Sequence, residues 1–261
     1  DRMESGGVTM RPEDGYGAVE FQDVSYTYPG TAVPALSHVS FRLEPGKKIA
    51  VVGMNGSGKT TMVKLLCRLY DPDGGRVMLN GRDVREYDYE EYLRRFSVVF
   101  QDFQLLALPL GENVAGGKDY DAARVRDCLE KAGFGKRLQR MKDGLSTFLY
   151  RNMDQEGVEI SGGEAQKIAL ARALYKDAPI VVLDEPTAAL DPVSEHEVYS
   201  GFRNLVGGRT AIFISHRLSS CRFCDEILVF HQGQLVQRGS HEELVKEEEG
   251  LYASMWRAQA Q

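Results

Sequence analysis

Two apolar patterns along the chain predict two kinds of β-strand. Residues 19–22 and 39–44 alternate between apolar and polar side chains, which is the pattern of a strand with one buried face. Residues 76–79, bracketed by Gly75 and Gly81, predict a third short strand. We expect these three segments to pair in a small antiparallel sheet.

Three further segments, 49–52, 180–183 and 211–214, are apolar without interruption. Strands that are covered on both faces have this composition, so these segments predict a parallel sheet between layers of helices. Polar residues follow each segment. In open α/β sheets, ligands bind beyond the carboxyl ends of the strands, and we expect the chemistry of this chain to lie there.

The stretch between the first two of these segments is helical in pattern. Residues 104–175 contain no comparable apolar run, whereas 121–132 and 164–176 show helical spacing. The predicted fold is therefore α/β, with a mostly parallel sheet, an N-terminal antiparallel β subdomain and an inserted α-helical subdomain. The predicted organisation is a linker at 1–17, the β subdomain with the first part of the core at 18–103, the helical subdomain at 104–175, the second part of the core at 176–240 and a C-terminal helical segment at 241–261.

Composition narrows the class of protein only modestly. The apolar content of 43% and the charged content of 27% are typical of a soluble globular chain. The formal charge of −6 argues against a nucleic-acid partner, and no apolar run approaches the roughly 20 residues that span a bilayer. The start at Asp1 suggests a piece of something longer. The pair Cys221-x-x-Cys224 lacks a second pair of zinc ligands, which favours partly buried thiols in a reducing cytosol.

A phosphate-binding loop follows the first continuous apolar segment. Residues 53–60 match the pattern G-x-x-x-x-G-K-S/T and precede a helical pattern at 61–70, which is the context that this motif requires. Lys59 is expected to bridge the β- and γ-phosphates, and Thr60 to offer its hydroxyl to Mg²⁺. The loop therefore predicts ATP and Mg²⁺ as cofactors. The expected nucleotide contacts here are Asn55, Gly56, Ser57, Gly58, Lys59, Thr60 and Thr61.

Two carboxylates end the second continuous apolar segment. Asp184 is expected to hold Mg²⁺ through water, and Glu185 to orient the attacking water and accept its proton. Alone, such a pair would equally suit a solvated strand end. Beside a phosphate loop, the catalytic interpretation is favoured.

The tetrapeptide Ser161-Gly162-Gly163-Glu164 precedes a predicted helix. Ser161 and Glu164 fit a capping box, which needs no ligand. The two glycines are not explained by capping, because each costs roughly 1 kcal/mol against Ala in a helix. They leave bare N–H groups at a helix N-terminus, which is an anion site. Since the chain has its own phosphate loop, this second site is predicted to face the nucleotide of another protomer.

Together these motifs resemble the nucleotide-binding domain of an ATP-binding cassette (ABC) transporter over about residues 18–260. The matching segments, in chain order, are the adenine-stacking Tyr28, the phosphate loop, the Q-loop Gln101, the signature at 160–164, Walker B at 183–187, the D-loop at 189–191 and the H-loop at 214–218.

The resemblance implies roles for residues that would be unremarkable alone. Tyr28 would stack on adenine, with Tyr26 as its competitor. Gln101 would contact Mg²⁺ and link to a membrane domain, and His216 would contact the γ-phosphate. Asp191 would reach across a dimer interface. Lys59, Glu185 and His216 would form the catalytic set.

The resemblance is strongest to exporters, on Arg217-Leu218 and on segments 239–244 and 250–252. It implies a motor domain on the cytoplasmic face of the cell membrane that hydrolyses ATP to power export. Two such domains, identical or not, would clamp two ATP molecules head to tail beneath a transmembrane partner. The apolar residues 103–110 would either pack in the core or line a groove for coupling helices of that partner.

Two alternatives remain at the level of sequence. A soluble cassette ATPase acting on DNA or ribosomes would usually carry coiled coils, tandem cassettes or a basic patch. A degenerate regulatory cassette would usually lack Glu185 or His216, both of which are present. ATPase activity that rises with DNA or ribosomes, but not with a membrane domain, would favour the first alternative. Steady-state ATPase activity measured against protein concentration would separate these cases.

Overall fold

The computed structural model describes residues 3–10, 17–100, 102–150, 157–184 and 206–259. The chain divides into two compact units. The first comprises Asp1–Phe96, Pro179–Asp184 and Gly208–Gln261, and the second comprises Ser97–Ala178 and Glu185–Gly207. The five predicted domain segments stay a prediction.

The first unit contains the expected antiparallel sheet. Its strands are β1 (Val19–Tyr26), β2 (Leu36–Leu43), β4 (Gly74–Leu79) and β5 (Arg82–Asp83), in the order β2-β1-β4-β5. Val19 lies opposite Leu43 on one side and Leu79 on the other. On the buried face, the Phe21 and Phe41 rings stack with centroids 4.6 Å apart. Alternating burial thus places one face of this sheet in the core, as the pattern predicted.

A second sheet in this unit carries the parallel strands. The strands β3 (Lys48–Val52), β7 (Ile180–Asp184), β8 (Thr210–Ile214), β9 (Glu226–His231) and β10 (Gln234–Gly239) lie in the order β10-β9-β3-β8-β7. Strands β9, β3, β8 and β7 run parallel, and β10 is antiparallel to β9. Every residue of β7 is buried, as its continuous apolar run predicted.

The β9–β10 hairpin was missed from the sequence, although it left a signal. Residues 227–230 are another continuous apolar run, and all are fully buried. The turn that follows uses positive φ at Gln232 (47°) and Gly233 (77°). Glycine suits that conformation, so a strand followed by Gln-Gly was a recognisable hairpin.

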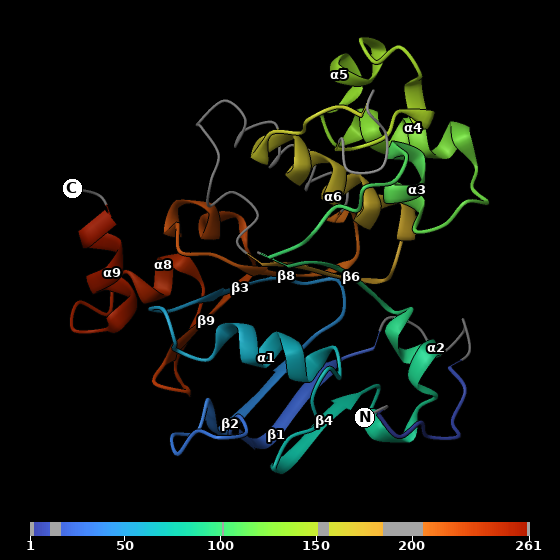
Figure 1. Cartoon of the computed structure of the whole chain (residues 1–261). Helices are drawn as coiled ribbons and strands as arrows, with labels where there is room; N and C mark the ends of the chain where they lie inside the picture. The colour runs from blue at the N-terminus through green and yellow to red at the C-terminus, as the bar shows by residue number, and fades with distance from the viewer. Residues whose placement is uncertain (1–2, 11–16, 101, 151–156, 185–205, 260–261) are drawn as a thin grey trace. The chain divides into compact units, whose positions relative to one another are not determined.

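Helices complete the first unit. They are α1 (Lys59–Leu66), α2 (Tyr89–Leu93), α8 (His241–Leu244) and α9 (Leu251–Gln259), with short 3₁₀ helices η2 (Val84–Glu86) and η4 (Leu218–Phe223). Helix α1 lies between the two sheets (Figure 1). It ends before the expected position 70, because the chain turns at Arg68 with φ of 53°.

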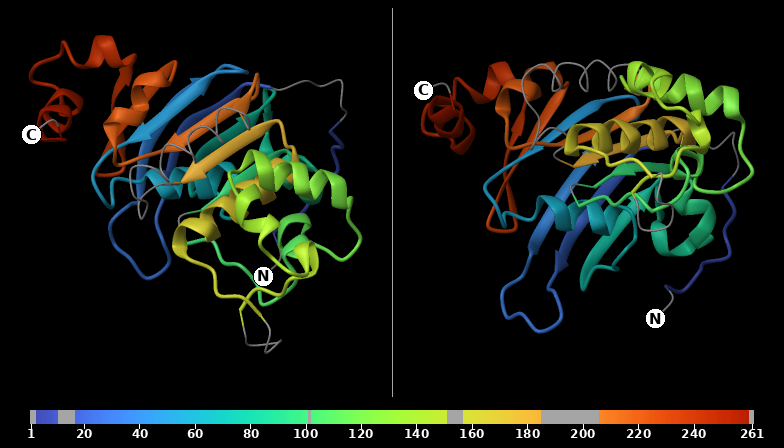
Figure 2. Two further views of the ribbon diagram at one scale, coloured as in Figure 1. Left: turned by 90° about the horizontal axis from the view of Figure 1, so that it is seen from above. Right: turned by 45° about the horizontal axis from the view of Figure 1, so that its top comes forward.

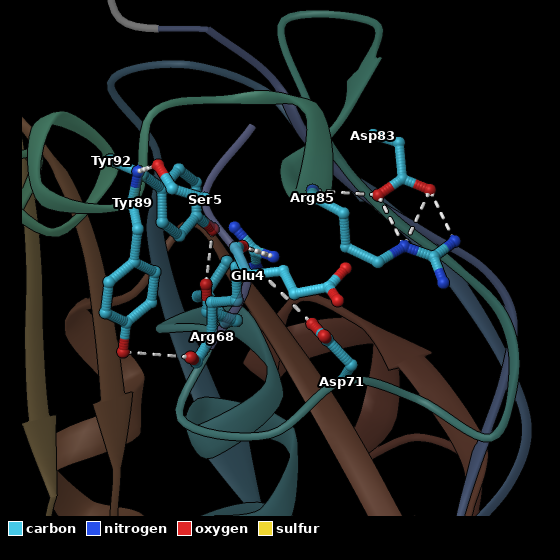
Figure 3. Close-up of polar contacts among 9 residues, drawn as sticks. Glu4, Ser5, Arg68, Asp71, Asp83, Arg85, Tyr89 and Tyr92 are labelled. Carbon is cyan, nitrogen blue, oxygen red and sulfur yellow. Dashed lines mark hydrogen bonds and ion pairs between the residues drawn. The ribbon is translucent and has the colours of Figure 1, made fainter. Parts of the chain in front are cut away.

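The N-terminal segment expected as linker is bonded to this unit along residues 4–10. Gly6 and Val8 donate backbone hydrogen bonds to Tyr87 O and Glu86 O at 2.9 and 3.0 Å. The buried Arg68 donates from Nη2 to Glu4 O at 2.6 Å, and Figure 3 shows its surroundings. A Cβ on Gly6 would stand 2.1 Å from Glu86 O, so the close approach of the two backbones requires glycine there.

The second unit is mainly helical in its described part. Strand β6 (Phe96–Val99) leads into helices α3 (Leu110–Ala115), α4 (Ala122–Lys131), α5 (Gly135–Gln139), η3 (Gly144–Ser146) and α6 (Gly162–Lys176). Helix α6 packs against α3 and α4 (Figure 2). Arg172 of α6 donates to Asn113 O of α3 at 2.8 Å. The predicted helical insertion is confirmed.

None of the helices in the described ranges combines the length and the apolar character that crossing a bilayer requires.

Candidate nucleotide-binding site

The register of three parallel strands brings the predicted chemistry to one edge of a sheet. Asp184, the last residue of β7, lies opposite Ile214 of β8, and Ile214 lies opposite Val51 of β3. Neighbouring strands are about 4.8 Å apart. The phosphate loop after β3, His216 after β8 and Asp184 therefore begin at the same edge of the sheet, within the first unit.

The phosphate loop has the backbone form that its glycines permit. Gly56 and Gly58 have φ of 74° and 108°, which L side chains rarely adopt. A Cβ on Gly53 would lie 2.4 Å from Phe230 O, and one on Gly58 would lie 2.7 Å from Leu36 Cδ2. The loop is thus held against β9 and β2 at two points where only glycine fits.

The start of α1 is open to an anion. Gly58 is its N-cap, no side chain caps it, and its first turn contains no acidic residue. The first backbone N–H groups of a helix have no intrahelical acceptor, and the helix dipole favours negative charge there. This end of α1 therefore suits a phosphate group.

Three side chains of the loop fit a bound triphosphate with its cation. Lys59 is 5% exposed, and its Nζ donates to Gly53 O at 2.5 Å and Met54 O at 3.2 Å. Ser57 is also buried, and its Oγ has no hydrogen-bond partner among the described residues, which leaves a donor for a ligand oxygen. The Thr60 side chain is exposed. The loop thus supplies a cation and hydroxyl groups of the kind that phosphate oxygens and Mg²⁺ bind.

The acidic residue and the histidine lie on adjacent strands. Asp184 is 3% exposed, and a buried carboxylate of this kind suits a cation. His216 is half-buried and follows Ser215, whose Oγ accepts from Arg217 N at 2.9 Å. The histidine backbone is thus held in a defined local turn.

The structure distinguishes Tyr28 from its competitor. Tyr26 is 5% exposed and lies in the core, whereas Tyr28 is half-buried. The Tyr28 hydroxyl lies 3.0 Å from Thr61 Oγ1 in α1. The Tyr28 and Tyr70 rings meet edge to face at 5.7 Å. Of the two tyrosines, Tyr28 is therefore the one that is partly exposed and contacts α1.

The Ser161 motif lies in the second unit, at the start of α6. The capping box is present, with Ser161 Oγ accepting from Glu164 N at 3.2 Å and Glu164 Oε2 accepting from Ser161 N at 3.1 Å. Gly162 is exposed, and a Cβ there would meet no atom within 4 Å. Nothing in the described packing therefore demands glycine at 162.

Other predictions fall in different places. Gln101, Glu185 and Asp191 lie outside the described residues. Within the apolar stretch 103–110, Leu110 is buried and Leu106 is 58% exposed, so this stretch divides between core and surface.

The cysteine pair is protected rather than reactive. Cys221 is buried, Cys224 is half-buried, and both are free thiols. Burial raises the pKa of Cys221 strongly and raises the pKa of Cys224 to about 12. Among the described residues, no group of three His, Cys, Asp or Glu side chains is placed to hold a metal ion.

A comparison with protein families decides which class of phosphate site this is. Residues 36–188 match the family described as ABC transporter. The chain belongs to the ABC transporter family. The P-loop NTPase core, the antiparallel N-terminal sheet and the helical insertion are those of an ABC ATPase domain, and nucleotide binding follows from the family.

Relatives of this ABC domain are named as flippases. The chain is 42% identical over 261 residues to an ATP-dependent lipid A-core flippase of Paraburkholderia xenovorans (strain LB400), covering 99% of this chain and 42% of the relative. It is 40% identical over 253 residues to a protein of the same name from Vibrio vulnificus (strain CMCP6), covering 96% of this chain and 42% of the relative. The chain thus spans about two fifths of the length of these relatives.

The fold agrees with a solved exporter. A structure titled "Structure of a bacterial Atm1-family ABC exporter with ATP bound" superposes with a TM-score of 0.88 and 34% identity, over 100% of this chain and 44% of that one. The resemblance to an exporter nucleotide-binding domain is therefore confirmed.

Proposed function

We propose that this ABC domain is an ATPase motor that powers export through a transmembrane partner, on the cytoplasmic face of a membrane. The observation that carries the proposal is the phosphate loop, in which the open end of α1, the buried Lys59 and the unpartnered Ser57 hydroxyl converge. Family membership and the exporter relatives support the coupling to transport.

In the proposed mechanism, Lys59 and the loop N–H groups bind the β- and γ-phosphates, and Tyr28 stacks on the adenine. Thr60, Asp184 and Gln101 would hold Mg²⁺, which supplies charge neutralisation at the phosphates when bound. Glu185 orients the attacking water and accepts its proton, and His216 contacts the γ-phosphate. Catalysis of this kind depends mainly on positioning and charge.

The site is proposed to be completed by a second nucleotide-binding domain. The exposed start of α6, with Ser161, Gly162 and Gly163, presents N–H groups at a helix N-terminus. In a head-to-tail dimer these groups would contact the γ-phosphate bound by the partner's phosphate loop. Two ATP molecules would then be enclosed per dimer.

The direct test is Glu185→Gln. This variant is expected to bind ATP and accumulate as an ATP-bound dimer in size-exclusion chromatography, with ATP turnover reduced by about 10²-fold or more. If the variant hydrolyses ATP at a rate near that of the unchanged protein, Glu185 does not have the proposed role.

The dimer is tested separately by kinetics. The rate of ATP hydrolysis is expected to rise with the square of protein concentration at low concentration, because two chains form each active site. A strictly linear dependence, with no dimer at any nucleotide concentration, would contradict the composite site.

A further inference from the structure

The C-terminal helix α9 reaches the backbone of the proposed γ-phosphate histidine through one side chain. Gln259 donates from Nε2 to His216 O, and its Oε1 accepts from Leu218 N at 2.9 Å. The two bonded backbone groups lie on either side of Arg217. The amide of Gln259 therefore bridges this short segment from outside.

The chemistry of this bridge suits an amide side chain. The bridge uses one donor and one acceptor at the same time, and the planar carboxamide of Asn or Gln carries both. Arg217 has φ of −96° and ψ of 102°, which is extended backbone. Gln259 thus pairs with the segment as a neighbouring strand would, although it is more than 40 residues away in the sequence.

Helix α9 is itself anchored to the structure next to His216. Tyr252 is fully buried in one apolar cluster with Leu218 and Cys221. Its hydroxyl lies 2.8 Å from His241 Nδ1. Helices α9 and η4 are in contact, and α9 is the red helix nearest the label C in Figure 2. Gln259 therefore projects from a helix that is fixed at its other end.

We propose that Gln259 is a positioning residue, which holds the His216 backbone so that the imidazole meets the γ-phosphate. The inference rests on the proposed function, since it assumes that His216 acts on ATP. Small displacements of a positioned group can lower rates by up to about 10²-fold. Because the bridge consists of two ordinary hydrogen bonds on an exposed side chain, we expect an effect of about 10-fold.

The test uses two replacements in the 261-residue chain. Gln259→Met keeps the length of the side chain and removes both hydrogen bonds. Gln259→Glu keeps the acceptor for Leu218 N but places a carboxylate oxygen against the carbonyl of His216. Both variants are expected to lower kcat by about 10-fold, with KM for ATP and the thermal unfolding midpoint nearly unchanged. Gln234→Met is the matched control, because Gln234 is exposed on β10 and its side chain makes no hydrogen bond to any described residue.

A double-mutant comparison separates this inference from the proposed function. If His216→Ala hydrolyses ATP normally, the proposed role of His216 is wrong. If His216→Ala is impaired, Gln259→Met is expected to cause no further loss in single-turnover hydrolysis when added to it. A silent Gln259→Met, or a second independent loss in the double variant, would overturn the positioning role.

A spectroscopic measurement provides an independent result. The chain has five histidines, and the His216 ring signal can be assigned in NMR spectra by its loss in His216→Ala. This signal is expected to shift in Gln259→Met and to stay in place in Gln234→Met. An unmoved signal in Gln259→Met would count against the bridge.

Discussion

Ser161→Ala separates the structural and the proposed catalytic role of one hydroxyl. Ser161 is exposed, so removing its hydroxyl leaves no cavity. The structural loss is the hydrogen bond that Glu164 N donates to Ser161 Oγ. Replacing a serine N-cap by Ala costs about 1 kcal/mol. In a protein of this size, that corresponds to a shift of about 2–4 °C in the unfolding midpoint. Since domains are stable by about 5–15 kcal/mol, the variant stays folded at 25 °C.

The catalytic consequence should be much larger than the structural one. Loss of one preorganised donor at a developing charge costs about 10²–10³-fold in kcat, whereas a cap loss of about 1 kcal/mol leaves nearly all molecules folded. ATP binding to the isolated monomer should be unchanged, because Ser161 is proposed to contact only the neighbouring chain's nucleotide. The assays are steady-state hydrolysis above the dimerisation concentration and nucleotide titration well below it.

The chain contains a matched control for this experiment. Ser240 caps α8 with a second complete capping box, formed with Glu243. Ser240→Ala should lower the unfolding midpoint by a similar amount and leave hydrolysis intact. The reasoning fails if Ser161→Ala hydrolyses ATP normally, if Ser240→Ala is equally inactive, or if Ser161→Ala weakens ATP binding by the monomer.

Three further predictions follow from the first unit. Gly58→Ala should lower the unfolding free energy by about 2–5 kcal/mol in urea titrations, because its Cβ would press on Leu36 Cδ2 at 2.7 Å and its φ of 108° adds backbone strain. Gly56→Ala, whose Cβ would meet no described atom within 4 Å, should cost only the backbone strain of about 1–2 kcal/mol. Lys59→Met should weaken ATP binding at least about 10-fold in fluorescence titrations, since a charged hydrogen bond contributes about 1.5–3 kcal/mol, and unchanged affinity would contradict its role. Burial raises the pKa of Cys224 to about 12. The folded protein therefore keeps a proton that the unfolded thiol releases above about pH 8.5. The stability that this group contributes is lost as the pH rises between these values, at up to about 1.4 kcal/mol per pH unit. Cys224→Ala should make that decline less steep in urea unfolding between pH 7.5 and 10, while the part due to the buried Cys221 thiol remains. An identical slope would refute the assignment.

Local pattern determined the strands and motifs of this protein. Residues 49–52, 180–183 and 211–214 became parallel strands that are buried except at Phe213, because covered strands need apolar residues on both faces. The capping box at Ser161 was equally visible, since its partners are three residues apart. Features whose partners are close in sequence can be recognised without knowing the fold.

The tertiary structure alone decided the contacts between distant segments. Periodicity does not show that Glu4 would accept a hydrogen bond from the buried Arg68, or that the Tyr28 hydroxyl would meet Thr61. The same holds for Gln259, whose exposed amide looks like any other until α9 is placed beside the segment after β8. Such pairings depend on which surfaces the folded chain brings together. They follow from packing of the whole core. The residues next to an amide or a guanidinium in the sequence do not indicate which group it will bond in the folded protein.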